Sequence, residues 1–137
     1  MTKIEYKYAH PDAKQYIELF DSTGWNAIYK ANLSELSKAL ENSWLVVTAY
    51  DAGELVGIGR IVSDGVLYAM IYDLIVMPSH QGRGIGTTIL GKLIDRCKDA
   101  EIRDVQLFSS KGKVRFYSKR GFVERPKDAP GMRFSKG

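Results

Sequence analysis

The chain has 137 residues, of which 45% are hydrophobic and 26% charged, so residues 1–137 fit a single compact domain and exclude a disordered or coiled-coil chain. The net charge is +4; one cysteine excludes an internal disulfide, and two distant histidines give no reason to expect a metal. No apolar stretch reaches the roughly 18 residues of a membrane span and no signal peptide is visible, so we expect a cytoplasmic protein away from membranes.

The first third of the chain predicts one strand and two helices. Alternation in KIEYKY (3–8) predicts a strand. Segment 11–23 begins with a proline and spaces its apolar residues helically, so a helix is expected there. A second short helix is expected over 33–42, where leucines recur along one helical stripe.

A hairpin and a long strand should follow. Segments 44–50 and 54–62 are separated by the sequence DAG, which is typical of a β-hairpin. After a turn at 63–65, the largely apolar residues 66–77 predict a long strand that ends at Pro78. An antiparallel run of strands is therefore expected in the middle of the chain.

The next part predicts a long helix from about Gly84 to Lys98. Its apolar face has members three to five positions apart, namely Ile85, Ile89, Leu90, Leu93, Ile94 and Cys97. Cys97 is therefore expected in the core and not as a reactive thiol.

Shorter elements should complete the chain. They are a strand over 104–110, a short helix over 112–121 with Gly121 as its C-cap, a strand at 122–124 and a possible last strand near 131–135. One strand–helix–strand crossover after an antiparallel run predicts an α+β fold, with a mixed, mostly antiparallel central sheet and flanking helices.

Positive charge is concentrated at the C-terminal end. Residues 111–137 contain 9 Lys and Arg against 2 Asp and Glu, whereas residues 1–110 contain 11 against 14. Such a basic segment can meet nucleic acid or a nucleotide cofactor, or can form a solvated face. Nucleic-acid binding is not expected, because the interleaved aromatic residues of a stacking platform are lacking.

Glycines occupy alternate positions 82, 84 and 86, between the long strand and the long helix. The dinucleotide pattern G-x-G-x-x-G fails at Thr87, and the pattern G-x-x-x-x-G-K-[ST] fails at Leu93. A strand, a glycine-rich turn and a helix N-terminus with unpaired N–H groups together favour an anion site. The alternative is a tight turn that only needs glycine.

Two motifs resemble those of one known family. QGRGIG (81–86) resembles the acetyl-coenzyme A loop Q/R-x-x-G-x-G/A of the GNAT superfamily of N-acetyltransferases, with matches at Gln81, Gly84 and Gly86. VRFYSKRGF (114–122) resembles the family's A-x-x-F-Y-x-K-x-G-F segment. The motifs follow in the family's order, separated by a helix and a strand, and the resemblance spans roughly residues 44–125. The chain is therefore similar to a small, single-domain, bacterial-type member.

The resemblance implies a site for acetyl-coenzyme A. The diphosphate would lie against the loop, whose residues are Gln81, Gly82, Arg83, Gly84, Ile85, Gly86 and Thr87, with Arg83 adding a charge-assisted contact. The pantetheine arm would bind like an added strand to the backbone of Leu74, Ile75 and Val76, and Ser110 would also contact it. Ser110 stands where many members have asparagine, and Lys113 where they usually have alanine.

Acetyl transfer needs a proton removed from the amine, the thioester oxygen stabilised and the departing thiolate protonated. Asp73 shares strand parity with Ile71 and Ile75 in an apolar stretch, so burial would make it a stronger base, and it matches the position where relatives often place one. The alternative is a structural carboxylate paired with Arg60.

Tyr117 matches the family's motif tyrosine, which lies near the coenzyme sulfur in many members and is the expected acid; the alternative is a core tyrosine. By resemblance, the oxyanion contact is the backbone N–H near Leu74.

Because no Cys–His nucleophile pair is apparent, we expect direct attack in a ternary complex. His10 and His80 are expected on loops, without catalytic duty.

The acceptor is expected to be a small-molecule or peptide amine of open identity. Trp25 and Tyr29 share a helix face, and Tyr72 lies on the central strand. A pocket of these aromatics would suit an amine with an apolar or aromatic body, although such stripes also build ordinary cores. The alternative function is a non-catalytic acyl-coenzyme A sensor. Because relatives are often homodimers, a homodimer is possible.

Overall fold

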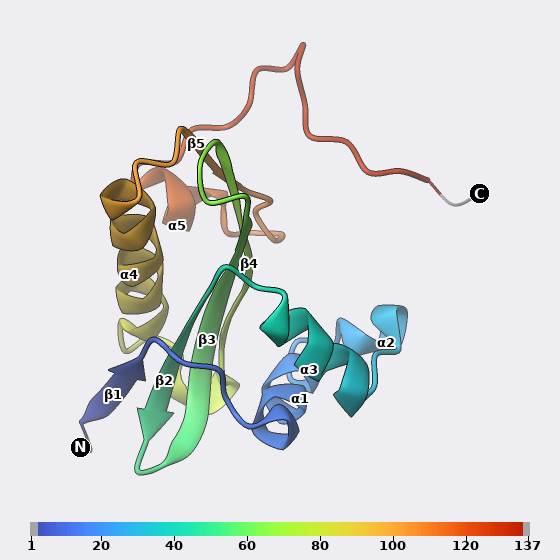
Figure 1. Ribbon diagram of the computed structural model, residues 1–137, viewed down its shortest axis with the longest axis vertical. Coiled ribbons are helices and arrows are strands. Elements are labelled where there is room, and N and C mark those ends of the chain that lie inside the picture. Colours follow the sequence, from blue (N-terminus) through green and yellow to red (C-terminus); the bar gives the residue numbers. More distant parts are fainter. Residues whose placement is uncertain (1–2, 136–137) are drawn as a thin grey trace. The chain divides into compact units, whose positions relative to one another are not determined.

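The computed structural model describes residues 3–135, and its five strands form one sheet in the order β1-β2-β3-β4-β5 (Figure 1). Their bounds are Ile4–Lys7, Leu45–Asp51, Glu54–Ser63, Tyr68–Val76 and Asp104–Leu107. Strands β1 to β4 pair antiparallel in succession, and α4 (Ile85–Asp99) connects β4 to β5. The expected α+β fold with a mixed, mostly antiparallel sheet is confirmed.

Helices cover both faces of the sheet. Helices α1 (Ala13–Asp21) and α3 (Leu33–Glu41) lie on one face and α4 on the other, with the short α2 (Asn26–Tyr29) between α1 and α3 in the chain (Figure 1). Local sequence fixes where they begin, because Asp12 caps α1 and Asn32 forms a capping box with Glu35 on α3. No helix within residues 3–135 has the length and apolar character needed to cross a membrane.

Burial of the helices' apolar stripes forms the core on both faces. The α1–α3 side contains Tyr16, Leu19, Phe20, Leu36, Leu40, Val46, Leu55, Ile58 and Ile75. Helix α4 buries Ile85, Ile89, Leu90, Leu93 and Cys97. Full burial of such aliphatic side chains stabilises by about 1.5–3 kcal/mol each. The expected core position of Cys97 is confirmed, since it is 1% exposed and burial raises the pKa of its thiol.

Two tight turns set the antiparallel pairing. Between β2 and β3, Ala52 and Gly53 have φ of 50° and 84°, the left-handed conformations that a two-residue hairpin turn requires. Between β3 and β4, the Asp64 carboxylate accepts hydrogen bonds from three successive N–H groups that follow it. Both expected turns are therefore formed by local hydrogen bonding and backbone geometry.

The chain divides into two compact units, residues 1–106 and 107–137. The second contains α5 (Val114–Ser118), whose C-cap is Lys119, two residues before the expected Gly121. The strands expected at 122–124 and 131–135 are not formed, because these segments are short and have no ladder partner among the described residues. A single domain over 1–137 remains a prediction.

Candidate active site

A β-bulge in the middle of β4 determines where its side chains point. Arg60 pairs with Tyr72 and Ile58 with Ile75, so Gly59 alone faces two residues of β4, Asp73 and Leu74. Asp73 has φ of 55°, a left-handed conformation that Asp and Asn tolerate better than most residues. Bulges are common beside active sites because they re-aim a side chain.

The bulge corrects one expectation. Strict alternation placed Asp73 on the face of both Ile71 and Ile75, but Ile71 pairs with Ile61, the neighbour of Arg60, and so points to the α4 side. Asp73 instead points to the α1 side, where its carboxylate meets Arg60. The extra residue therefore puts Tyr72 and Asp73, which are consecutive, on one face.

The Asp73 carboxylate is held by two donors on the same oxygen. Its Oδ2 accepts from Arg60 Nε at 2.6 Å and from the Tyr16 hydroxyl at 2.7 Å. Arg60 Nη1 also donates to Ser43 Oγ, and the Ser43 hydroxyl donates to the Ala39 carbonyl. The side chain of Asp73 is 12% exposed, and no described residue bonds to its Oδ1. The predicted pairing with Arg60 is present, and one carboxylate oxygen remains available to a substrate.

Burial and the Asp73 carboxylate act in opposite directions on the pKa of Arg60 and in the same direction on that of Tyr16. Burial alone would lower the pKa of Arg60, but the Asp73 carboxylate outweighs it, and the pKa of the guanidinium is raised. Burial and the nearby carboxylate both raise the pKa of Tyr16, so its hydroxyl stays protonated and donates. Tyr16 was not predicted as a site residue, although it is buried on the same face of α1 as Leu19 and Phe20.

The glycine turn follows β4 through a short 3-10 helix, η1 (Pro78–His80). Gly82 and Gly84 both have φ of 79°, and a Cβ added at either would meet no heavy atom within 4 Å. Gly84 is the N-cap of α4 and Gly86 lies in the first turn. A tight turn is sufficient to explain the glycines at 82 and 84, because both have a left-handed backbone. Gly86 has a helical backbone, which does not require glycine, so the tight turn alone does not explain the glycine at 86.

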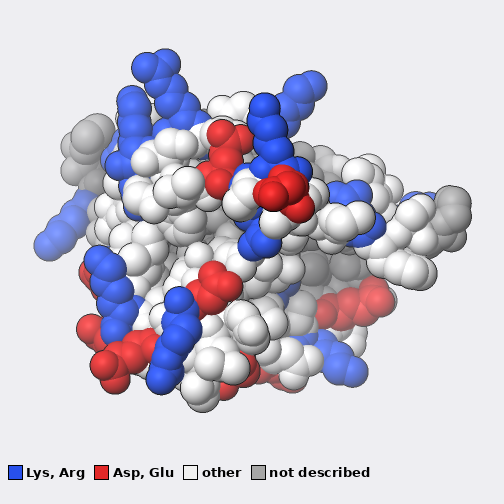
Figure 2. Space-filling view, turned by 90° about the horizontal axis from the view of Figure 1, so that it is seen from above, with Lys and Arg blue, Asp and Glu red and all other residues white. Residues whose placement is uncertain are grey.

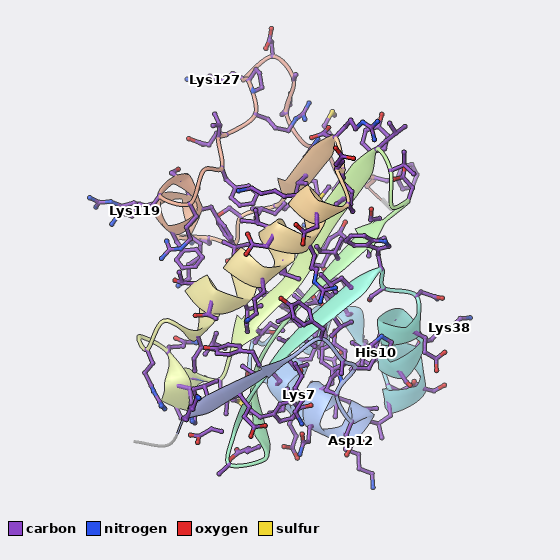
Figure 3. All side chains as sticks on the ribbon, turned by 60° about the vertical axis from the view of Figure 1, so that its left-hand side comes forward. Lys7, His10, Asp12, Lys38, Lys119 and Lys127 are labelled. Atoms are coloured by element: carbon purple, nitrogen blue, oxygen red, sulfur yellow. The ribbon has the colours of Figure 1, made fainter. Side chains whose placement is uncertain are left out.

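Three further loop residues are placed by specific contacts. Gln81 Nε2 donates to the Val76 carbonyl at 3.0 Å, which ties the loop to the end of β4. His80 Nε2 lies 2.8 Å from Asp51 Oδ2, and Arg83 Nη1 lies 4.0 Å from the same oxygen. His80, which was expected on a loop, is the last residue of the 3-10 helix η1 and has a structural partner on β2. His10 is exposed on the segment between β1 and α1 (Figure 3).

The backbone N–H groups of the three strand residues expected to bind pantetheine do not all point to the same edge of β4. The Met77 N–H bonds to the Val56 carbonyl on β3. Because N–H directions alternate along a strand, the N–H of Ile75 also points to β3, whereas those of Leu74 and Val76 point to the opposite edge. Leu74 and Val76 therefore direct their N–H groups to the edge on which β5 lies, whereas the N–H of Ile75 is directed to β3 and its side chain is buried in the core.

In the second unit, Tyr117 lies in α5 between two aromatic rings. Its ring centroid is 5.1 Å from that of Phe116 and 5.9 Å from that of Phe122, and burial raises the pKa of its hydroxyl. The Tyr117 ring therefore packs edge-to-face against Phe116 and Phe122 within the second unit. Ser110 is exposed and its carbonyl accepts from the Lys113 N–H.

The expected acceptor residues have different environments. Trp25 and Tyr29 both contact the ring of Phe20, at 6.0 and 6.1 Å between centroids, and Trp25 packs against the core. Tyr29 is 68% exposed. Tyr72 lies under Arg60, with 5.7 Å from guanidinium carbon to ring centroid, and faces the side that carries Asp73. Of these three, the structure brings only Tyr72 to the Asp73 cluster.

On the face drawn in Figure 2, charged side chains of both signs are interspersed, although the excess of Lys and Arg lies in residues 111–137. Lys and Arg side chains project separately over the face in Figure 2, with Asp and Glu between them. Lys119 and Lys127 extend outwards from the second unit (Figure 3). Within residues 3–135, no group of three or more His, Cys, Asp or Glu could hold a metal ion.

Comparisons with protein families and with known proteins show what this chain is similar to. The acetyltransferase (GNAT) domain matches residues 13–133, across both compact units. The uncharacterized N-acetyltransferase ycf52 of Pyropia yezoensis is 34% identical, covering 95% of this chain and 79% of that protein. Serotonin N-acetyltransferase 2, chloroplastic, of rice (Oryza sativa subsp. japonica) is 34% identical over 72% of this chain and 52% of its own length.

A solved structure shares the fold. SA2161, a probable acetyltransferase from Staphylococcus aureus, superposes with a TM-score of 0.85 at 26% identity, covering 97% of this chain and 99% of that one. The likeness extends beyond the two motifs to almost the whole chain.

Proposed function

The chain belongs to the GNAT family of acetyltransferases, and from this premise we propose that it transfers the acetyl group of acetyl-coenzyme A to a primary amine by direct attack. The observation that carries the proposal is the arrangement of two features along the chain. A bulge in β4 directs the Asp73 side chain to the α1 side of the sheet, and an open glycine turn follows β4 at the start of α4. Because its relatives are named as transferases, the alternative of a non-catalytic sensor gains no support.

The residues fit a coenzyme A site. Gly82 and Gly84 leave open space in front of the turn, so a diphosphate can approach the backbone there and the first N–H groups of α4. Bound acetyl-coenzyme A supplies the activated thioester. The N–H groups of Leu74 and Val76 would hold the pantetheine arm, with Leu74 nearest the oxyanion.

Asp73 would accept the amine proton through its Oδ1, because Tyr16 and Arg60 both engage Oδ2. Tyr117 would donate a proton to the departing thiolate, and its raised pKa keeps the hydroxyl protonated to higher pH than usual. No covalent enzyme intermediate is required.

The acceptor would lie on the Tyr72 side of the sheet, which suits an amine with an aromatic or apolar body. A relative named as a serotonin N-acetyltransferase is consistent with that class. Trp25 and Tyr29 remain proposed acceptor contacts, together with a cytoplasmic location and a possible homodimer.

The test is release of free coenzyme A thiol with acetyl-coenzyme A and a panel of aromatic amines, aliphatic amines, polyamines, amino acids and lysine peptides. We expect turnover above the no-amine background, with aromatic amines preferred. Binding of coenzyme A without turnover on any amine would contradict the proposal and favour the sensor. Preference for a non-aromatic class would contradict only the acceptor.

A further inference from the structure

One carboxylate connects the β2–β3 turn to both parts of the glycine loop. Asp51 is the last residue of β2, and its Oδ2 meets His80 Nε2 at 2.8 Å and Arg83 Nη1 at 4.0 Å. His80 precedes the glycines and Arg83 lies between two of them. The side chains of Asp51 and His80 are only 16% and 15% exposed, so the contact is largely shielded from solvent.

The second imidazole nitrogen is also engaged. Ser79 Oγ lies 2.7 Å from His80 Nδ1. When the Ser79 hydroxyl donates to Nδ1, the ring proton is on Nε2 and points at the Asp51 carboxylate. The neutral imidazole can thus make both hydrogen bonds at once, with the Ser79 hydroxyl donating to Nδ1 and Nε2–H donating to Asp51.

We propose that Asp51 and His80 are positioning residues for the coenzyme diphosphate. They fix the loop to the hairpin, so that Gly82 and Gly84 keep their left-handed backbone and Arg83 stays at the loop instead of extending into solvent. This inference rests on the proposed function, because it assigns the loop to the coenzyme. Neither residue touches the reacting atoms.

The physical basis is preorganisation. A glycine-rich loop has many accessible conformations, and ordering it upon binding lowers affinity. Gln81 already fixes one point by its bond to the Val76 carbonyl, and Asp51 fixes the segment on either side. Removing the side chain of Asp51 or His80 should therefore lower the affinity only for ligands that contact the loop.

The experiment compares two donors that differ in the diphosphate. Acetyl-coenzyme A contains it, and S-acetylpantetheine does not. For Asp51→Ala and His80→Ala we expect KM for acetyl-coenzyme A to rise five- to tenfold, tenfold being about 1.4 kcal/mol, with kcat within twofold. With S-acetylpantetheine, kcat/KM should stay within twofold of wild type. Ser79→Ala should act in the same direction with a smaller effect.

Asp64→Ala is the matched control, because Asp64 supports the other hairpin turn of the same sheet. It should leave the KM values for both donors unchanged. Equal losses with both donors, or no rise in KM for acetyl-coenzyme A, would overturn the positioning role. If Asp51→Ala does not fold, His80→Ala removes the same contact from the other side, and Asp51→Asn removes the carboxylate charge while keeping the shape of the side chain.

Calorimetry with coenzyme A separates this inference from the proposed function. A wild-type chain that binds coenzyme A but acetylates nothing would contradict the transferase proposal alone. The dissociation constants of the variants for coenzyme A would still decide the positioning role, with a five- to tenfold rise expected and an unchanged value overturning it.

Discussion

Asp73 combines an unusual backbone with an asymmetric set of partners. Its left-handed φ places the carboxylate on the α1 side, and its two donors share one oxygen. Arg60 and Tyr16 can thus hold the carboxylate while the other oxygen meets the amine. The pairing of Asp73 with Arg60 and a catalytic role for its other oxygen are therefore compatible.

Asp73→Asn should lower kcat/KM at least tenfold without changing affinity for coenzyme A. Asn keeps the shape and tolerates the left-handed backbone, but it cannot accept the amine proton. The loss should be greatest at lower pH, where amines are protonated. A wild-type pH–rate profile for this variant, measured by thiol release, would make Asp73 structural.

Tyr117→Phe should lower kcat at least tenfold and leave affinity for coenzyme A nearly normal. The substitution removes one hydroxyl and keeps the ring contacts with Phe116 and Phe122. General acid catalysis typically contributes about 10²–10⁴-fold, and a thiolate is already a fair leaving group, so the low end is expected. A change within twofold, with chemistry rate-limiting, would assign Tyr117 to packing only.

Tyr16 should make the fold sensitive to alkali. Its pKa is raised in the folded chain, so the unfolded chain loses this proton first, near the ordinary value of 10.0. The stabilisation is present below that pH and is lost as pH rises towards the folded pKa. In urea unfolding, Tyr16→Phe should show a smaller decrease in the free energy of unfolding between pH 9 and 11 than wild type; an identical decrease would contradict the assignment.

At the scale of elements, substitutions in the glycine loop can distinguish a glycine that the turn conformation requires from one that leaves room for the ligand. Gly84→Val should lower affinity for acetyl-coenzyme A at least tenfold, about 1.4 kcal/mol. The valine would also be strained at φ of 79°, so stability should decrease as well.

Gly86→Ala is the cleaner test, because Gly86 lies within α4. Alanine is favoured over glycine in a helix by about 1 kcal/mol, so the melting temperature should hold or rise. Affinity for coenzyme A, measured by calorimetry, should nevertheless fall. If this variant binds like wild type, a close approach of the diphosphate at this position is wrong.

The sequence predicted the long elements and the site's loop, but not the bulge. Periodicity identified α4, which has one buried face, whereas β2 and β3 were identified by their apolar runs on either side of a turn, because the sheet is buried on both faces. Alternation cannot detect an extra residue such as Asp73, which depends on β3 pairing and on Gly59, where a Cβ would come within 2.8 Å of Ile89 and Leu93. Tyr16 was missed because an isolated tyrosine in a helix stripe looks the same whether or not its hydroxyl has a buried partner.

At the scale of the whole molecule, ligand binding should stabilise the fold. At a hundredfold excess over the dissociation constant, acetyl-coenzyme A should add about 2.7 kcal/mol to the free energy of unfolding. S-acetylpantetheine at the same concentration should add less, since it lacks the diphosphate. A melting temperature that does not change with acetyl-coenzyme A would contradict the donor site.

The C-terminal unit shows the limit of local patterns. Its helix and the aromatic packing of Tyr117 follow from the motif, whereas the segments after it lack strands although they contain alternating apolar residues. Val123, Met132 and Phe134 are each more than 80% exposed. Strand formation requires a partner ladder, which short alternation cannot supply by itself.

The buried thiol of Cys97 can report whether the chain is folded. The chain has one thiol, and it is buried on the apolar face of α4 in the native state. A colorimetric thiol reagent should therefore see the released coenzyme and not the intact enzyme. When the reaction stops, denaturant should expose one additional thiol per chain, which counts the folded molecules that took part. Timed labelling of the same atom would report how often α4 separates from the sheet.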